Sequence, residues 1–487
     1  MHLDTLLQSL DLSSDIRGQV TGLQVDSRLV LPGNIFIAVP GASCDGREHI
    51  VEALDAGAIM VLYEPNGCNI HHDLSARCVQ VANLADRVSI LACAFYGDPS
   101  RGLSVVGVTG TNGKTTIAHQ LAQANILLNK SAAYIGTLGL GDVYALQPST
   151  NTTPGALCMQ RTLSECYQQG IEQVCMEVSS HGLAEKRVSN IAFEQAIYTN
   201  LTHDHLDYHG TMANYAAAKK DLFKTKSLKS AIINVDDAYA QQMISAVPSG
   251  CQVITYGLHP GADVYAKNIK YGISGTSFDV VSLFGDAHLS TTGLGQFNIY
   301  NALAVFSSLL AQGNNFNAVS DVMSRLKSCP GRMEVVLHSP VVVVDYAHTP
   351  DALENVLQTL TKFKVAESSS KLWVVFGCGG DRDRTKRPIM GMIASKYADM
   401  VVITSDNPRK ESPESIINAI AAGVTDESKV MKILDRAQAI REVLSLANAN
   451  DIILIAGKGH ESYQEIGTER IFFSDQAIVR ADVKINA

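Results

Sequence analysis

The sequence has no long hydrophobic run and no apolar leader. Its first residues, MHLDTLLQSLDLSSD, lack the basic start and the apolar core of a secretory signal. No apolar run approaches the roughly 18 residues that a membrane-spanning helix needs. These absences argue against an integral membrane protein, and we expect a cytoplasmic protein without membrane insertion.

Paired cysteines and excess positive charge are also missing. The ten cysteines include no CxxC pair, which argues against structural zinc and predicts free thiols in a reducing compartment. The formal net charge is -9 and the pI is about 5.9, whereas proteins that bind nucleic acids usually carry a basic face. We therefore expect no nucleic-acid partner, while an anionic small molecule needs only a few local cations.

The length and two breaks in composition predict the domain organisation. A chain of 487 residues exceeds one ordinary core, so we expect about three domains. FYGDPSRGLSV (residues 95–105) and RLKSCPGRMEVV (residues 325–336) are breaks rich in glycine, proline and polar residues. They predict domains over residues 1–100, 101–333 and 334–487.

Apolar segments alternate with helix-length stretches through most of the chain. The segment between the two breaks contains LSVVGVTG, QVCMEV, FEQAIYTNL and SAIINVDD. The segment after the second break contains VVVVDYA, LWVVFG, MVVITSD and DIILIAG. This alternation predicts an α/β fold whose mostly parallel sheets are covered by helices on both faces. In the first hundred residues, NIFIAVPG and AIMVLYEP are the predicted strands.

The segment GVTGTNGKTT joins a predicted strand to a predicted helix over residues 115–128. Gly110 and Gly113 allow backbone N–H groups to approach phosphate oxygens closely. Lys114 can reach the terminal phosphates, and the hydroxyl of Thr115 or Thr116 can bind magnesium. The segment therefore predicts a nucleotide triphosphate site.

This phosphate loop departs from the full Walker pattern, which places a glycine five positions before Gly113. The chain has Val108 there, so the loop is a shortened or shifted variant. The alternative is a glycine-rich turn with an incidental lysine. The order of strand, loop, Gly-Lys-Thr-Thr and helix favours the phosphate loop.

Two further polar segments, MEVSSHGL and TNLTHDHLDYHG, each follow an apolar strand. In open α/β sheets, ligands bind beyond the carboxyl ends of the strands. Glu177 offers a hard oxygen ligand of the kind that magnesium prefers. The second segment adds a His/Asp cluster made of His203, Asp204, His205, Asp207 and His209. A solvated or hydrogen-bonded loop is the alternative interpretation of that cluster.

Ten motifs in order carry a resemblance to a known family. GTNGKTT, EVSSHGL, TNLTHDHLDYHG, YAAAKKDLF, GQFNIYNALA, PGRME, DYAHTPDAL, GCGGDRDRTKRP, TSDNPR and GKGHE resemble the motifs of the Mur ligases, the ATP-dependent amide-forming enzymes of peptidoglycan precursor synthesis. VDSRLVLPGNIFIAVPG in the N-terminal segment is similar as well. The resemblance implies a UDP-substrate domain, a central P-loop-type ATPase domain and a C-terminal Rossmann-like amino-acid domain. We expect a monomer.

The resemblance also implies roles for individual residues. Catalytic roles fall on Lys114, Lys219 and His205. The magnesium sites would use Thr115, Glu177, His205 and Lys219. ATP would contact Gly110, Thr111, Asn112, Gly113, Lys114, Thr115, Thr116, Asn298, Asn301, Arg332 and Asp345. The UDP-linked substrate would contact Ser27, Asn151, Thr152, Thr153, Ser179, Glu185 and Arg187. The incoming amino acid would contact Arg382, Asp406, Asn407, Pro408, Arg409, Gly457 and Glu461.

Three of these assignments have specific alternatives or departures. The resemblance implies that Lys219 carries a carbamate, since CO2 converts a cationic amine into an anion suited to magnesium. A solvated helix lysine is the alternative. Asn298 and Asn301 could instead serve as helix caps, and Glu185 stands where family members often have glutamine.

The resemblance and the polar residues of the last third together predict the reaction. Arg409 and Arg382 offer two guanidiniums for carboxylates, and Glu461 offers a carboxylate for an ammonium. A Pro-turn with a solvated Arg409 and a salt bridge at Arg382 are the alternatives. The Asp-Asn-Pro-Arg motif resembles family members that use meso-diaminopimelate.

We therefore expect an ATP-dependent ligase that adds meso-diaminopimelate to UDP-MurNAc-L-Ala-D-Glu through an acyl phosphate, with Mg2+ as cofactor. Such a reaction belongs to cell-wall synthesis and so to cell shape and division. Three alternatives stay open: a relative that adds L-lysine, a folylpolyglutamate-type ligase, and a P-loop module that hydrolyses ATP without forming an amide.

Overall fold

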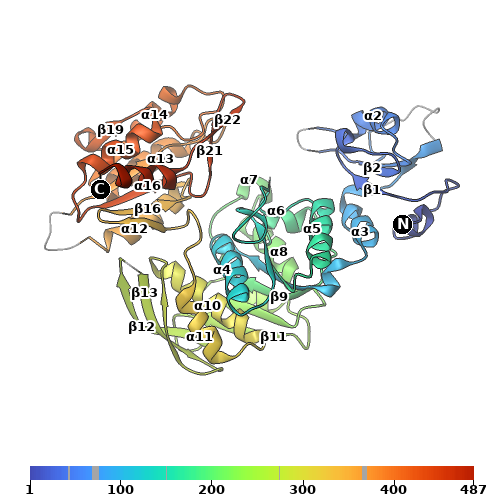
Figure 1. The fold of residues 1–487 in the computed structure, drawn as a ribbon, viewed down its shortest axis with the longest axis horizontal. Helices are drawn as coiled ribbons and strands as arrows, with labels where there is room; N and C mark the ends of the chain where they lie inside the picture. Colours follow the sequence, from blue (N-terminus) through green and yellow to red (C-terminus); the bar gives the residue numbers. More distant parts are fainter. Residues whose placement is uncertain (42–43, 68–75, 150, 274, 365–369, 487) are drawn as a thin grey trace. The chain divides into compact units, whose positions relative to one another are not determined.

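A computed structural model describes residues 1–41, 44–67, 76–149, 151–273, 275–364 and 370–486. The chain forms two compact units (Figure 1). The first unit comprises Met1–Tyr265 and Leu303–Val322, and the second comprises Ala266–Ala302 and Met323–Ala487. The predicted boundaries of three domains stay a prediction.

The first unit begins with a small four-stranded parallel sheet in the order β1-β2-β3-β4. Its elements are α1 (Leu3–Gln8), β1 (Gly22–Gln24), β2 (Asn34–Ala38), α2 (Ile50–Asp55), β3 (Met60–Tyr63), β4 (Cys78–Gln80) and α3 (Leu84–Tyr96). Alternate residues of β2 enter different cores, because successive side chains point to opposite faces. Ile35 packs in a core with residues of α1 and α3, and Phe36 packs in a core with residues of α2.

The larger sheet of the first unit carries the phosphate loop. Its elements are β5 (Ser104–Thr109), α4 (Lys114–Leu127), β6 (Ala132–Gly136), β7 (Gly139–Gly141), α5 (Ala156–Gln168), β8 (Gln173–Glu177), α6 (Ser180–Ala184), β9 (Phe193–Tyr198), α7 (Leu206–His209), α8 (Met212–Phe223), β10 (Ser230–Asn234), α9 (Ala240–Ile244) and β11 (Gln252–Gly257). The strand order is β11-β10-β9-β5-β8-β6-β7, and only β7 pairs antiparallel.

Three elements cross the division between the units: β12 (Val264–Gly272), α10 (Gln296–Ala311) and α11 (Phe316–Arg325). In the second unit, β13 (Gly275–Ser282) pairs antiparallel with β14 (Ala287–Thr291). This meander was not predicted, although TSFDVVS alternates polar and apolar residues as a half-exposed strand does.

The second unit also holds a six-stranded sheet in the order β15-β16-β20-β17-β18-β19. Its elements are β15 (Glu334–His338), β16 (Val341–Asp345), α12 (Pro350–Thr361), β17 (Leu372–Phe376), α13 (Lys386–Tyr397), β18 (Met400–Ile403), α14 (Pro413–Ala421), β19 (Val430–Lys432), α15 (Arg436–Leu446), β20 (Ile452–Ala456) and α16 (Asp475–Asn486). All pairs are parallel except β15 with β16. A hairpin of β21 (Tyr463–Ile466) and β22 (Glu469–Phe472) follows β20.

Helices cover both faces of this second sheet. Leu372 and Val374 of β17 pack in a core with residues of α12, α13 and α14, while Trp373 and Val375 pack in a core with residues of α15 and α16. The predicted α/β class is confirmed, since most strand pairs in both large sheets are parallel and the predicted apolar segments form their strands.

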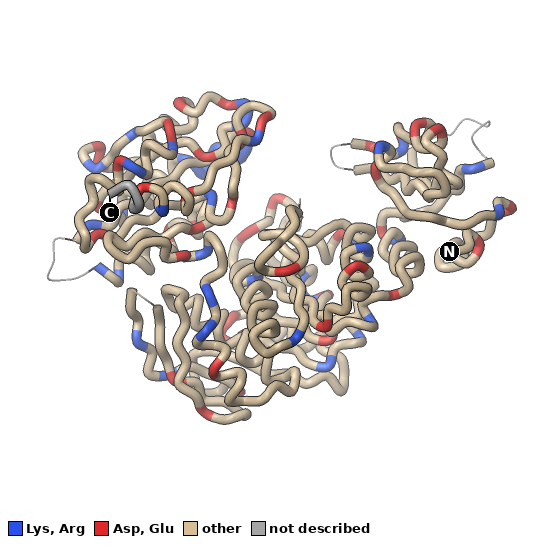
Figure 2. Tube along the Cα trace, viewed as in Figure 1, with Lys and Arg blue, Asp and Glu red and all other residues tan. Residues whose placement is uncertain are grey.

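Two further sequence predictions concern composition. The described cysteines are all free thiols. Within the described ranges, no helix has the length and apolar character needed to cross a bilayer. Figure 2 shows Lys and Arg interspersed with Asp and Glu along the trace of each unit, on a chain whose net charge is -9.

Candidate active site

The glycine loop lies between β5 and α4, at the carboxyl end of a central strand. Gly110 and Gly113 have φ angles of 153° and 89°, which residues with a side chain rarely adopt. A Cβ at Gly110 would lie 1.8 Å from the Oγ1 of Thr199, so the backbone leaves no room there for a larger residue. Val108, the position of the missing glycine, lies inside β5, and the loop is shorter on its strand side.

Lys114 is the first residue of α4, and its ammonium is held over the loop. Its Nζ donates to the carbonyl oxygens of Gly110 at 2.9 Å and Thr111 at 2.8 Å. The first turn of a helix adds N–H groups without intrahelical partners and a partial positive charge. Lysine and helix terminus together form a site for an anion. Thr116 is buried in the first turn of the same helix.

The loop is fastened to the segment that follows β9. The backbone N–H of Thr111 donates to the carbonyl of Asn200 at 2.8 Å, and the N–H of Asn112 donates to the side-chain oxygen of Asn200 at 3.0 Å. The hydroxyl of Thr199 donates to the carbonyl of Asn112 at 2.6 Å. Thr111 also shares a 3.1 Å hydrogen bond with the phenol of Tyr215 in α8. The loop therefore has a fixed shape before any ligand binds.

Glu177 ends β8 and is fully buried next to the loop. Its Oε2 accepts a hydrogen bond of 2.9 Å from the hydroxyl of Thr115. Its Oε1 accepts from the phenol of Tyr134 at 2.5 Å and from the backbone N–H of Thr137 at 2.8 Å. The carboxylate and the threonine hydroxyl, both predicted as magnesium ligands, are thus in direct contact.

Lys219 lies in α8 and is only 1% exposed. Its Nζ donates to the carbonyl of Gly110 at 2.7 Å and lies 4.5 Å from the centre of the Tyr215 ring. Burial, together with the nearby charge of Lys114, holds the pKa of Lys219 well below its usual range. The expected alternative of a solvated lysine is wrong, because this amine is enclosed and shares the Gly110 carbonyl with Lys114.

The His/Asp segment brings several rings together beside the loop. The His181 ring of α6 lies 4.9 Å from that of His205 and 4.2 Å from that of Tyr208. His209 stacks on Tyr215 at 5.1 Å. Burial lowers the pKa of His181, His205 and His209, so these imidazoles are biased toward the neutral form.

His205 has two properties that mark it within this cluster. Its φ angle is 54°, a strained backbone conformation for a residue with a side chain. Asp204 raises its pKa, but burial and the charges of Lys114 and Lys219 outweigh that effect. His203, from the same predicted cluster, is exposed.

Four residues expected to contact the UDP-linked substrate form one network at the end of β8. The hydroxyl of Thr153 donates to the carbonyl of Glu177 at 2.9 Å and accepts from the N–H of Ser179 at 2.9 Å. Arg187 donates to the carbonyl of Thr153 at 2.8 Å and pairs with Glu185 at 2.5 Å. The pairing keeps Glu185 beside Arg187.

The other three residues of that set lie in different surroundings. The hydroxyl of Thr152 lies 3.0 Å from that of Thr137, next to the Glu177 carboxylate. Asn151 is exposed. Ser27 belongs to the N-terminal sheet region, where its hydroxyl donates to Glu52 at 2.8 Å.

The remaining residues expected to contact ATP lie in the second unit. Asn301 donates to the side-chain oxygen of Asn298 at 3.2 Å, and both are buried in α10. The Asp345 carboxylate accepts from two backbone N–H groups, and burial raises its pKa. The Arg332 guanidinium stacks 4.5 Å from the Tyr346 ring, and its buried Nε has no partner among the described residues. That orphaned donor is suited to an incoming acceptor.

Two loops at the carboxyl ends of β18 and β20 meet in the second unit. We call residues 404–409 the Asn407 loop and residues 456–461 the Glu461 loop. The buried ammonium of Lys458 donates to Asn407 Oδ1 and to Glu461 Oε2, each at 2.9 Å. Asn407 in turn donates to Glu461 Oε2 at 2.9 Å. A side chain at Gly457 is excluded, because its Cβ would lie 2.6 Å from the Asp406 carboxylate.

Arg409 follows Pro408 in the Asn407 loop and, like His205, has a positive φ angle, here 50°. Its Nε pairs with Glu465 Oε2 at 2.8 Å, and its Nη1 donates to the carbonyl of Gly380 at 2.9 Å. A Cβ at Gly379 would lie 3.0 Å from Arg409 Nη1 and 3.6 Å from Arg382 Cγ. The two predicted arginines therefore flank one glycine.

The alternatives considered for these arginines do not hold. Arg409 is not a solvated side chain, since it is 23% exposed and paired. Arg382 is exposed and makes no salt bridge among the described residues. The bridge in its segment belongs instead to Arg387 and Arg384, which pair with Glu411.

The residues around Glu177 fit magnesium in part. Carboxylate and hydroxyl oxygens are hard donors of the kind that magnesium binds, and here they touch each other at 2.9 Å. An unmodified lysine ammonium has only donors and is no ligand. No three His, Cys, Asp or Glu side chains converge on a metal position in the described part of the chain. Magnesium would therefore depend on Thr115, Glu177, phosphate oxygens and a modified Lys219.

We call the phosphate-loop site of the first unit and the site of the Asn407 and Glu461 loops in the second unit the two half-sites. Several of their residues were not singled out from the sequence: His181, Tyr134, Tyr215, Lys458, Glu465 and Arg470. His181, Tyr215 and Lys458 lie within quoted motifs, so a signal for them existed. Tyr134 reaches Glu177 across 43 positions of the chain. No local pattern announces a contact of that length.

Three family models match successive parts of the chain. Family models described as Mur ligase family, catalytic domain, Mur ligase middle domain, and Mur ligase, glutamate ligase domain match residues 19–96, 108–309 and 331–459. A relative from Chromobacterium violaceum, named UDP-N-acetylmuramoyl-L-alanyl-D-glutamate--2,6-diaminopimelate ligase, is 45% identical over 96% of this chain and 94% of its own length.

Two solved structures extend the comparison to the fold. A structure with the same ligase name has a TM-score of 0.72 at 37% identity, covering 100% of this chain and 99% of its own. The folylpolyglutamate synthase of Mycobacterium tuberculosis, solved with ADP and AMPPCP, has a TM-score of 0.61 at 18% identity, covering 77% of this chain and 92% of its own. At that identity the second likeness concerns the fold alone.

Proposed function

The chain belongs to the Mur ligase family, and on that premise we propose that it joins meso-diaminopimelate to UDP-MurNAc-L-Ala-D-Glu at the expense of ATP. The observation that carries the proposal is the gathering of four predicted residues at the carboxyl ends of β5 and β8. Lys114 and Lys219 share the Gly110 carbonyl, and the Thr115 hydroxyl touches the buried Glu177 carboxylate.

The first chemical step is the activation of a carboxylate. The γ-phosphate of ATP moves to the D-glutamate side-chain carboxylate, which gives an acyl phosphate and ADP. Lys114 and the first N–H groups of α4 lie where they can neutralise the charge on the transferred phosphoryl group. Glu177 and Thr115 would hold magnesium, which would supply further neutralisation of the phosphate charge.

The second step forms the amide. The amine of diaminopimelate attacks the acyl carbon, the new C–N bond forms, and inorganic phosphate leaves with the former carboxylate oxygen. The amine must lose a proton during this step. We assign the binding of the UDP-linked substrate to the residues around Thr153 and the binding of the amino acid to the residues around Asn407. Holding each reactant in a fixed pose lowers the entropy cost of its reaction.

We assign Lys219 a carbamate. Carbamylation needs a neutral amine, and burial biases Lys219 toward that form. The neutral amine nitrogen bonds to the carbon of CO2 and releases one proton, so an uncharged amine becomes an anion. A carbamate has the oxygen donors that the ammonium lacks, and it would relieve the repulsion between Lys219 and Lys114.

Specificity for diaminopimelate is assigned to the Asn407 and Glu461 loops. Arg409 and Arg382 flank Gly379 and offer cations for carboxylates, while Glu461 offers an anion for an ammonium. L-lysine lacks one of the two carboxylates, so it would leave one guanidinium facing no partner. The geometry thus favours diaminopimelate over the lysine alternative.

Three wider proposals accompany this function. The protein acts in the cytoplasm, where nucleotide-linked precursors are made, and it acts as a monomer. Its UDP-substrate, ATP and amino-acid roles divide over three domains with boundaries near residues 100 and 333. Ser27, Asn151, Thr152 and Thr153 contact the UDP-linked substrate together with Ser179, Glu185 and Arg187.

The test is a coupled assay of phosphate release with UDP-MurNAc-L-Ala-D-Glu and a panel of amines. We expect release only when ATP, the dipeptide substrate and diaminopimelate are all present. Release with ATP alone would indicate a hydrolysing P-loop module. Release that requires L-lysine, or a folate with glutamate, would support the corresponding ligase instead.

A further inference from the structure

We infer that Arg436 and Asp475 form a positioning pair that fixes the Asn407 loop and the Glu461 loop relative to each other. The inference rests on the proposed function, because that proposal gives these loops the task of amino-acid binding. Neither residue belongs to the motifs quoted from the sequence. Both side chains are 0% exposed, so neither reaches solvent.

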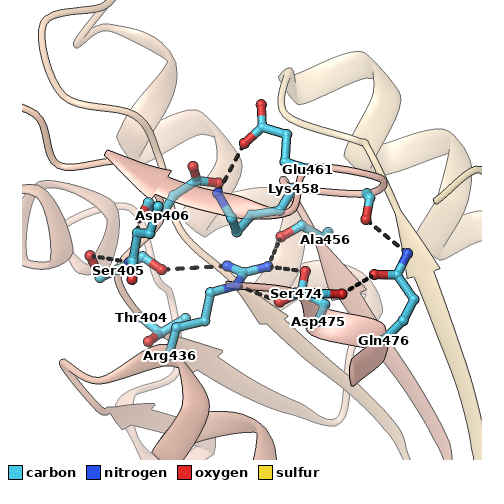
Figure 3. Close-up of polar contacts among 12 residues, drawn as sticks. Thr404, Ser405, Asp406, Arg436, Ala456, Lys458, Glu461, Ser474, Asp475 and Gln476 are labelled. Atoms are coloured by element: carbon cyan, nitrogen blue, oxygen red, sulfur yellow. Dashed lines mark hydrogen bonds and ion pairs between the residues drawn. The ribbon is translucent and has the colours of Figure 1, made fainter. Parts of the chain in front are cut away.

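The pair has the two-pronged geometry of a strong guanidinium–carboxylate contact. Arg436 Nε lies 2.8 Å from Asp475 Oδ1, and Nη2 lies 2.9 Å from Oδ2. Figure 3 shows the guanidinium lying between the Asn407 loop on one side and the start of α16 on the other. Two parallel hydrogen bonds fix the plane of the guanidinium as well as its position.

The remaining N–H groups of Arg436 reach the main chain of both loops. Nη2 donates to the carbonyl of Ala456 at 2.9 Å, directly before Gly457. Nη1 donates to the carbonyl of Ser405 at 3.5 Å, directly before Asp406. One side chain thus contacts the first residues of two loops that come from different strands, β18 and β20 (Figure 3).

The start of α16 adds a second, independent contact to the Glu461 loop. Gln476 follows Asp475, and its Nε2 donates to the carbonyl of Gly459 at 2.9 Å. Gly459 lies between Lys458 and Glu461, whose side chains meet Asn407. Arg436 therefore holds the beginning of this loop, and Gln476 holds its middle.

Stability alone is a weak explanation for such a pair. Removing a guanidinium and a carboxylate from water costs solvation energy, which their attraction offsets only in part. Burial lowers the pKa of Arg436. The carboxylates of Asp475, Asp406 and Glu461 raise that pKa by more than burial lowers it, so the guanidinium stays charged. Two of those three carboxylates belong to the loops, and the buried charge is matched to the amino-acid site.

Arg436→Lys is the first test. Lysine keeps the charge opposite Asp475 but cannot contact two carbonyls and a carboxylate in one plane. We expect KM for diaminopimelate to rise roughly tenfold, the effect of one lost charge-assisted hydrogen bond. KM for ATP and for the UDP-linked dipeptide should stay at the wild-type value, and kcat should stay within about threefold, a split that a general loss of stability does not produce.

Asp451→Asn is the matched control. Asp451 is likewise 0% exposed, but it precedes β20 at the opposite end of the strand, where it accepts from Trp373 Nε1 at 3.0 Å and from the Lys371 N–H at 2.8 Å. We expect this variant to lower the melting temperature and to leave KM for diaminopimelate unchanged. An equal rise of that KM in both variants would overturn the inference.

Gln476→Ala covers the case in which Arg436→Lys does not fold, because this side chain is only half-buried. Its amide also donates to Glu334 Oε2 at 3.2 Å. We expect a rise of about threefold in KM for diaminopimelate from the loss of the hydrogen bond to the Gly459 carbonyl. An unchanged KM in this variant, or in a folded Arg436→Lys, would refute the positioning role. Failure of the wild type to use diaminopimelate would refute the proposed function instead, which keeps the two failures distinct.

Discussion

The two half-sites treat positive charge differently. In the first unit, Lys114 and Lys219 both donate to the main-chain carbonyl of Gly110, at 2.9 and 2.7 Å. In the second unit, Arg409 and Lys458 are paired with the side-chain carboxylates of Glu465 and Glu461. Carbonyl dipoles orient an ammonium without neutralising it, whereas a carboxylate cancels its charge.

This difference matches the ligands that we assign to each half-site. A nucleotide triphosphate brings several negative charges and no positive one, so it suits a loop that keeps the Lys114 ammonium unneutralised. An amino acid with two carboxylates and ammonium groups has both signs, and it suits a site in which Arg409 and Lys458 are already paired with carboxylates. There the ligand exchanges one partner for another, which favours selectivity over raw attraction.

The largest expected effect is on the phosphate loop. Lys114→Ala removes the cation at the first turn of α4, and we expect amide formation to fall by at least about 10²–10³-fold. The measurement is kcat in the phosphate-release assay. Lys130→Ala is the matched control, since this lysine lies beyond the other end of α4 and bonds Asn314. Near-normal turnover of Lys114→Ala would remove Lys114 from the proposed phosphate contacts.

The second prediction concerns the carbamate. Lys219→Ala should lose activity by roughly 10²-fold, as for one lost electrostatic contact in an active site, and a small added carboxylate should restore part of it. Intact-protein mass spectrometry under mild conditions should also show an added CO2 on the wild type. Lys220→Ala changes the next residue of α8 and should retain both activity and the adduct. An active Lys219→Ala variant without an adduct in the wild type would contradict the assignment.

The third prediction tests the paired charges of the second unit. Arg409→Ala should lower kcat/KM for diaminopimelate by roughly 10- to 150-fold, the effect of one lost charge-assisted contact. KM for ATP and for the UDP-linked dipeptide should change little. Lys410→Ala removes a neighbouring exposed charge and serves as the control. Equal wild-type kcat/KM values for diaminopimelate and L-lysine would show that Arg409 does not select the second carboxylate.

The contrast between the half-sites was only partly predictable from the sequence. Short-range patterns sufficed for the phosphate loop, because a strand, two glycines and Gly-Lys-Thr-Thr adjoin in the chain. The same holds for the strands, whose apolar runs match β5, β8, β16 and β20. Loops at strand ends meet in space, so the Asn407 and Glu461 motifs could be placed at one edge.

The partners of those charges could not be predicted in the same way. Glu465 reaches Arg409 across 56 positions, and its segment follows the last quoted motif. The burial of Lys219 depends on the packing of α8 against the loop, which no local pattern in YAAAKKDLF encodes. The antiparallel strands β13 and β14 were not predicted, because they are partly exposed and contain no fully apolar run.

The smallest expected effect separates pairing from positioning at Arg409. Glu465 bridges two arginines, since its Oε2 pairs with Arg409 at 2.8 Å and its Oε1 pairs with Arg470 at 2.9 Å. Glu465→Gln removes the competing negative charge but leaves an amide oxygen that can still accept from Arg409 Nε. The main-chain bond from the Arg409 N–H to the carbonyl of residue 465, at 3.0 Å, does not depend on the side chain.

The guanidinium should therefore keep its place in Glu465→Gln and attract a substrate carboxylate more strongly. A partly exposed pair contributes up to about 1 kcal/mol, so we expect KM for diaminopimelate to fall by about two- to fivefold. L-lysine offers no second carboxylate and should gain nothing, which would raise the selectivity ratio. Arg470→Gln is the opposing variant, because it leaves Glu465 entirely to Arg409 and should weaken diaminopimelate binding by a similar factor. A rise in KM after Glu465→Gln would mean that the carboxylate mainly holds Arg409 in position, and the second half-site would then be built on orientation and not on exchange of charged partners.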